Sequence, residues 1–360
     1  MNKKWSILIL TLVLSMTMAL TGCTSKQDPK EAMKSATGNL AKMTSYEMKS
    51  KVIIKDLQVS TADTANKEAA SQVMSMLKDA EITVDGVYQS EPMQTELTAG
   101  INLKGDMSMS FNIPMVMTKE KLYVKIPKIP MLPLPENLIN KYLILDLKEL
   151  AEQEGKKFNP EAFDTKKTQQ LGNEILNSLF EEYDGKKYFK DINVKDANLP
   201  EGVDAKQVVQ FNVTNENVKE AAEVFVNKAL PKILDILAKD EYRDMVGLTK
   251  EEIDKAKSDL NSTSNQDQIS KGLNDLKNHL KINQFYVNTA IDKKDFPSYR
   301  SSVINVEMND PETKDNVKLS VELTSQNTKV NEKQTFKIGI PKDEDTVTME
   351  QLQNEMGAAY

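Results

Sequence analysis

The chain has 360 residues, of which 28% are charged and 6% aromatic, and its formal net charge is −7 with a pI near 5.2. This acidic balance, without a basic stretch that carries interleaved aromatic residues, disfavours nucleic acid as a partner. The single cysteine, Cys23, and the single histidine, His279, exclude an internal disulfide, a thiolate zinc cluster and a histidine-based triad within one chain.

The first 22 residues have the pattern of an export signal. Lys3 and Lys4 precede an apolar run over residues 5–20, which is shorter than the roughly 20 residues of a membrane-spanning helix. The run ends in Leu20-Thr21-Gly22-Cys23, which resembles the lipobox of bacterial lipoproteins. That resemblance implies that residues 1–22 are removed and that Cys23 becomes the lipidated first residue. An ordinary cleaved signal followed by a chance cysteine is the alternative.

Lipidation at Cys23 would place the protein at the extracytoplasmic face of the cell membrane in a bacterial envelope. Each buried methylene of an acyl chain contributes about 0.8 kcal/mol, so a multiply acylated cysteine anchors a protein that does not span the bilayer. Residues 23–27 are then a lipidated tether, and residues 28–360 are predicted to form a single domain close to the membrane.

Asp28 as an N-cap and Pro29 in the first turn predict a helix whose apolar stripe ends at Met43. A first strand is predicted after Ser45, because apolar and charged residues alternate there. Residues 61–79 are predicted to be a helical insertion between strands, and residues 82–88 the next strand.

Two consecutive strands, Met93 to Leu103 and Met107 to Met117, dominate the predicted sheet. Apolar and polar residues alternate in both, so a pleated strand places nearly all apolar groups on one face. Residues 104–106 suit a tight hairpin between them. We therefore predict an apolar, methionine-rich surface. Its candidate ligand-binding residues are Met93, Leu97, Ile101, Met107, Met109, Phe111, Met115 and Met117.

The middle of the chain is predicted to be mostly helical. Strands are expected at residues 122–126 and 142–147, and the four prolines of residues 127–135 predict an extended apolar loop between them. A helix at residues 165–183 and a strand at residues 207–213 precede a helical block over about 215–280. Within this block, Pro231 is expected to kink or split a helix, and Thr249 with Glu252 forms a capping box.

The C-terminal part returns to short alternating segments. Four strands are predicted around residues 285–291, 304–308, 317–323 and 336–340, with turn-forming residues between them. Thr348 and Gln351 predict the start of a short closing helix. The whole pattern indicates an α+β protein with about 11 mostly antiparallel strands and one covered sheet face.

This order of elements is similar to the LolA-like lipoprotein-carrier superfamily, which includes the LprG and LppX lipoproteins. The lipobox, the helix-to-strand phrase LAKMTSY at residues 40–46 and the strands at 121–125 and 142–146 also resemble uncharacterised exported lipoproteins related to that superfamily. The resemblance implies a curved antiparallel half-barrel with helices covering an apolar concave face, no catalytic residue and no cofactor. The helical block and the insertion at 61–79 depart from the family pattern.

The leading functional hypothesis is a non-catalytic carrier that binds a lipid or another hydrophobic ligand, since methionine side chains repack around different occupants. Its expected partners are the membrane, through Cys23, an amphiphile and an envelope protein. A structural or protein-interaction lipoprotein with a permanently packed core is the alternative. Less favoured is Cu(I) binding by Met107 with Met109 or by Met115 with Met117, because histidine and cysteine are missing nearby. No common catalytic motif occurs.

Overall fold

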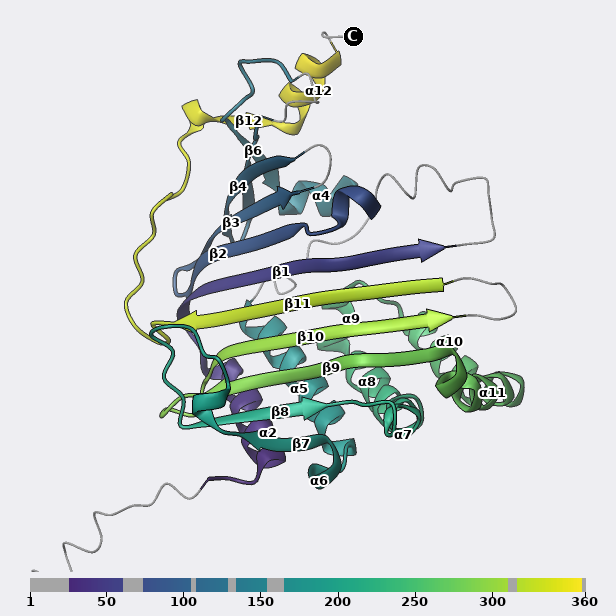
Figure 1. The fold of residues 1–360 in the computed structure, drawn as a ribbon. Helices are drawn as coiled ribbons and strands as arrows, with labels where there is room; N and C mark the ends of the chain where they lie inside the picture. Colours follow the sequence, from purple (N-terminus) through teal and green to yellow (C-terminus); the bar gives the residue numbers. More distant parts are fainter. Residues whose placement is uncertain are drawn as a thin grey trace, which may run out of the picture.

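The computed structural model describes residues 26–60, 74–104, 108–128, 134–153, 165–309 and 316–357. Twelve strands form one sheet in the order β12-β6-β5-β4-β3-β2-β1-β11-β10-β9-β8-β7 (Figure 1). Their bounds are Ser45–Ser60 (β1), Glu81–Ser90 (β2), Met93–Leu103 (β3), Met109–Thr118 (β4), Lys121–Lys125 (β5), Tyr142–Asp146 (β6), Phe189–Ile192 (β7), Gln207–Asn212 (β8), Leu280–Ile291 (β9), Pro297–Asn309 (β10), Asn316–Thr328 (β11) and Thr346–Thr348 (β12). The α+β half-barrel predicted from the sequence is confirmed, with one strand more than expected.

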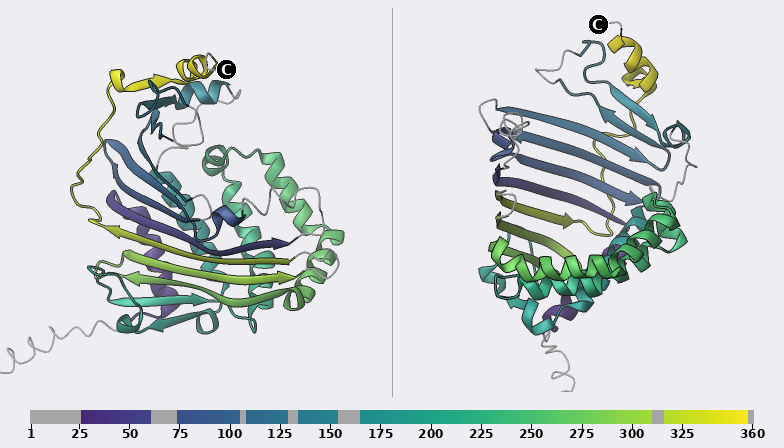
Figure 2. Two further views of the ribbon diagram at one scale, coloured as in Figure 1. Left: turned by 45° about the horizontal axis from the view of Figure 1, so that its top comes forward. Right: turned by 90° about the vertical axis from the view of Figure 1, so that its right-hand side faces the viewer.

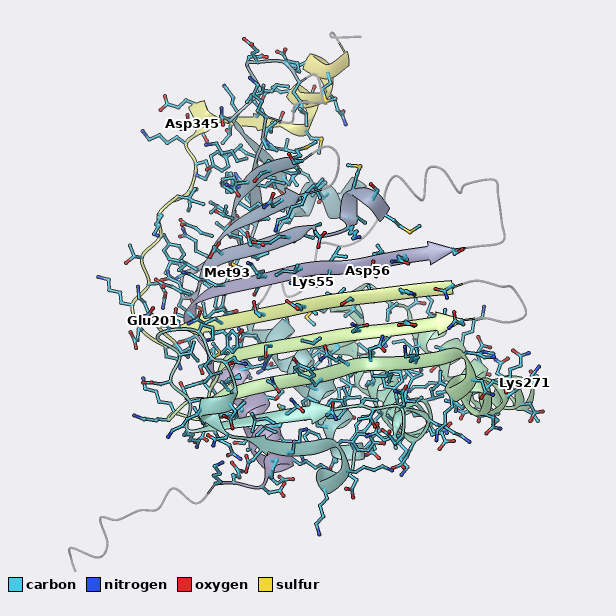
Figure 3. All side chains as sticks on the ribbon, in the orientation of Figure 1. Lys55, Asp56, Met93, Glu201, Lys271 and Asp345 are labelled. Carbon is cyan, nitrogen blue, oxygen red and sulfur yellow. The ribbon has the colours of Figure 1, made fainter. Side chains whose placement is uncertain are left out.

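The two halves of the sheet meet at β1 and β11. These strands pair antiparallel along almost their whole length, although most of the chain separates them in sequence. Every other neighbouring pair is also antiparallel except β12 with β6. Lys55 and Asp56, labelled in Figure 3, mark the place where a bulge shifts the β1–β11 register. The sheet curls without closing into a barrel (Figure 2).

Most of the helices lie on the concave face of the sheet, behind it in Figure 1. Their bounds are Pro29–Asn39 (α2), Leu147–Gln153 (α4), Thr165–Glu182 (α5), Gly185–Tyr188 (α6), Val218–Val224 (α7), Leu230–Leu237 (α8), Asp240–Val246 (α9), Lys250–Asn261 (α10), Thr263–His279 (α11) and Met349–Gly357 (α12). None of the helices in the described ranges is long and apolar enough to cross a membrane.

The first helix starts where the sequence predicts. The Asp28 side chain accepts hydrogen bonds from the backbone N–H groups of Lys30 and Glu31, at 3.1 and 3.3 Å, and Pro29 occupies the first turn. Its buried side chains, Ala32, Met33 and Ala36, are at most 2% exposed. One face of this helix therefore packs in the core.

The predicted helical block is present as α7 to α11, from Val218 to His279. Pro231 lies in the first turn of α8, and the π-helical residues Phe225–Ala229 join α7 to α8 in place of a proline kink. The capping box of α10 is confirmed, because the side chains of Thr249 and Glu252 each accept a bond from the backbone N–H of the other residue.

The strand predicted at residues 336–340 is wrong. These residues belong to a C-terminal strap, residues 329–342, which runs from β11 to the β12 region beside the sheet (Figure 1). Glu96 of β3 accepts backbone hydrogen bonds from Lys337 and Ile338 at 2.7 and 2.9 Å, and from Gly339 at 2.6 Å. N–H groups of a strand alternate in direction, so three consecutive ones cannot converge on one carboxylate. Glu96 is 4% exposed and holds the strap on the convex face.

Two short strands at the two edges of the sheet, β7 and β12, were not predicted from the sequence. In contrast, the closing helix α12 begins as predicted, with the Thr348 side chain accepting a hydrogen bond from the Gln351 N–H. Some predictions fall wholly or partly outside the described residues: the signal and Cys23, the helix over residues 61–73, the hairpin corner at 105–106, Met107, and residues 129–133 of the proline-rich loop.

Candidate ligand-binding face

The strand register places one continuous, mostly apolar row across the concave face. Residues directly paired on neighbouring strands point to the same side of a sheet. Following the pairs from β8 to β4 gives the row Phe211, Val287, Ser302, Leu323, Val52, Ile82, Ile101 and Phe111. Along the row only Leu323 is exposed, and the other members are partly buried.

The predicted candidate residues share this face. Leu97 pairs with Met115 and Ile101 with Phe111, while Leu103 and Thr95 pair with Met109 and Met117. Met93, at the start of β3 (Figure 3), is 7% exposed and buried. The other described members, from Leu97 to Met117, are only partly buried. Met107 lies outside the described residues.

Over β7 to β9 the concave face is sealed by helices. Phe189, Val209 and Ile291 are 4%, 0% and 1% exposed, and they pack with buried residues of α2. Phe211 is surrounded by aromatic rings, with centroid distances of 5.3 Å to Tyr183 and to Phe189. This half of the face is a packed protein core.

A polar contact joins two of the helices. The Glu174 carboxylate on α5 accepts hydrogen bonds from the Tyr242 hydroxyl of α9 and from the ammonium of Lys239, both at 2.6 Å. Burial alone raises the pKa of Glu174, but the bonds from Lys239 and Tyr242 outweigh it and hold the pKa below its ordinary value. Helices α5 and α9 are therefore joined by a charged group that stays ionised.

From β10 to β4 only one end of the same face is sealed: Tyr88 and Thr95 are 2% and 6% exposed there, whereas residues in the middle of the strands are not fully covered. Leu323 lies in the middle of β11, a central strand, yet it is 36% exposed. Its row neighbours Val52, Ile82, Ile101 and Phe111 are partly buried. At one end of the strands, Val59 and Met308 are 38% and 44% exposed. An apolar surface of this kind, inside the curve of a sheet, is a candidate site for a hydrophobic ligand.

Two features of this face were not predicted from the sequence. Leu323 was predicted to lie in a strand but not in the site, and Arg300 was predicted in neither. Arg300, Ser302, Ile304 and Val306 alternate with the outward-facing residues of β10, so the sequence already indicated an arginine on the apolar side. The described ranges contain no group of three His, Cys, Asp or Glu residues that could hold a metal ion.

No family model matches the chain, and no curated protein matches it. The candidate site therefore rests on the geometry of the sheet and its helices.

Proposed function

We propose that the protein is a lipid-anchored, non-catalytic lipoprotein of the cell envelope that binds a hydrophobic or amphiphilic ligand on the concave face of its sheet. One observation carries the proposal: Leu323, at the centre of the sheet, is 36% exposed on a face that is mostly apolar. On the covered part of the same face, Val209 and Ile291 are 0% and 1% exposed.

Energetics support an occupant for the open half of this face. Each Å² of apolar surface removed from water contributes about 25 cal/mol, so a hydrocarbon chain on this row gains free energy with every side chain it covers. Met109, Met115 and Met117 lie on β4, the strand that carries Phe111 at the end of the row. Their unbranched side chains adapt to ligands of different shape.

The proposal predicts a sharp difference between two adjacent residues. Leu323 lies on the concave face, and Thr324 points to the convex face. With residues 26–360, Leu323→Asp should weaken binding of 1-oleoylglycerol at least about tenfold, because a carboxylate resists desolvation by hydrocarbon. Thr324→Asp adds the same charge and should leave binding unchanged. Isothermal titration calorimetry, with circular dichroism to establish folding, measures both.

Two results would contradict this site. Equal binding by both variants and the unaltered protein would place the ligand elsewhere. Absence of binding by the unaltered protein, together with no amphiphile in native mass spectra after purification, would leave a lipoprotein with a structural or protein-binding role.

The anchor has its own test. The lipobox ending at Cys23 supports lipidation, so Cys23→Ser in the full chain should abolish incorporation of labelled palmitate and release the protein from the membrane fraction. Thr24→Ser is the matched control, because it alters the next residue, leaves the thiol in place and should keep both the label and the membrane association. Retention of label and membrane association in the Cys23→Ser variant would overturn the proposed anchor.

A further inference from the structure

One charged side chain interrupts the apolar concave face. Among the paired positions of β1–β6 and β8–β11 on this face, only Arg300 carries a charge. It pairs with Thr289 of β9 on one side and with Ser325 of β11 on the other. Arg300 therefore lies two residues before Ser302 on the same face of β10. Ser302 belongs to the mostly apolar row that contains Leu323.

The guanidinium of Arg300 has no partner among the described residues, since no hydrogen bond or ion pair joins it to any of them. The neighbouring Ser325 hydroxyl accepts a bond from the Ser50 hydroxyl at 3.1 Å. Neither β9 nor β11 carries an acidic residue at a concave position beside Arg300. Asp191 has a concave position on β7, three strands away, and its carboxylate accepts a hydrogen bond from Gln207 at 2.7 Å.

Such an arrangement is unfavourable for the empty protein. Burial lowers the pKa of the Arg300 guanidinium, although an arginine remains protonated at neutral pH. Removing a charge from water without a counter-charge opposes folding, and buried charges in proteins are normally paired. Arg300 is only partly buried, so an anion that enters the concave face can contact its side chain. The five N–H donors of its guanidinium are available to such an anion.

We propose that Arg300 binds the anionic headgroup, a phosphate or a carboxylate, of an amphiphile whose hydrocarbon chain lies along the apolar row from Leu323 to Phe111. This inference rests on the function proposed above. A guanidinium bonds both anions through two parallel N–H groups, and Ser302 and Ser325 flank it on the same face. From β11 to β4 the row spans about 19 Å at roughly 4.8 Å per strand, comparable to an extended acyl chain of about 16 carbons.

Three probes that share the same hydrocarbon chain but differ in headgroup distinguish binding of the headgroup from binding of the chain. Residues 26–360 would be titrated calorimetrically with oleate, 1-oleoyl lysophosphatidate and neutral 1-oleoylglycerol, each below its micelle concentration. At least one anionic probe should bind about tenfold tighter than the neutral one. Arg300→Gln should remove that preference and leave the neutral probe unchanged, while Arg300→Lys should retain part of it. Lys49→Gln is the control, since it removes an exposed cation of the opposite face.

Each result decides between the two proposals. Tighter binding of oleate identifies a carboxylate headgroup, and tighter binding of lysophosphatidate identifies a phosphate. Equal binding of all three probes, unaltered in Arg300→Gln, overturns the headgroup site but supports the apolar face. An equal loss for all three probes in Arg300→Gln assigns Arg300 a structural role and also overturns the inference. If no probe binds, the proposed function fails as well.

Discussion

Phe211 and Phe111 stand at opposite ends of one row of paired residues and are both partly buried, but their neighbours differ. Phe211 packs in a cluster of aromatic rings beneath helices, whereas Phe111 lies on the part of the sheet where Leu323 is 36% exposed. The strands of both regions alternate in the same way. The comparison teaches that one sheet face can serve as a protein core at one end and as an accessible apolar surface at the other.

The largest difference between the two regions is expected when each ring is removed in turn. Phe211→Ala should lower the free energy of unfolding by about 3–5 kcal/mol, because it leaves a cavity among packed rings. Phe111→Ala should lower it by about 1 kcal/mol, since Phe111 lies outside the core clusters of the described residues. Urea denaturation of residues 26–360 without added ligand measures both. Equal losses would show that the two ends of the face are packed alike.

A smaller effect is expected from the contact between Glu96 and the C-terminal strap on the convex face. Glu96→Gln should lower the free energy of unfolding by about 2 kcal/mol, because an uncharged amide replaces a carboxylate that accepts three backbone hydrogen bonds from the strap. Amide hydrogen exchange at Lys337, Ile338 and Gly339 should accelerate. Unchanged exchange at these three amides would refute the role of Glu96.

The matched control for this variant is Glu47→Gln. It removes a carboxylate on another strand, β1, and breaks an exposed ion pair with Lys329. Exposed pairs contribute little, so stability should change by less than about 1 kcal/mol. A loss as large as that of Glu96→Gln would show that burial of the carboxylate is not what distinguishes the two sites.

Several parts of the fold could be predicted because their signals are local. The strand Met93–Leu103 has the predicted bounds, and the caps at Asp28 and Thr249 form as expected. Alternation also assigned Leu97, Ile101, Met109 and Met115 to one face. These features depend on neighbours within a few residues, so the sequence contains the necessary information.

Other parts depended on contacts between distant residues. The alternation of Phe336, Ile338 and Ile340 is that of a strand, but Glu96, more than 200 residues earlier, captures the N–H groups of this segment. The edge strands β7 and β12 are too short to give a periodic signal, and they form because a neighbouring strand supplies their hydrogen bonds. Alternation along β10 could place Arg300 on the apolar side, but only the register shows that it lies between Thr289 and Ser325, without an acidic neighbour on either strand.

By itself, the sequence determined which side chains share a face of strands such as β3 and where the capped helices α2 and α10 begin, because the period of a strand and the chemistry of a cap are local properties. Only the tertiary structure decided which part of the apolar face is covered. Burial depends on where α2, α5 and the α7–α11 block come to rest on the curved sheet. That position leaves Leu323 accessible and Arg300 without a counter-charge among the residues described, and no pattern within a single strand encodes either outcome.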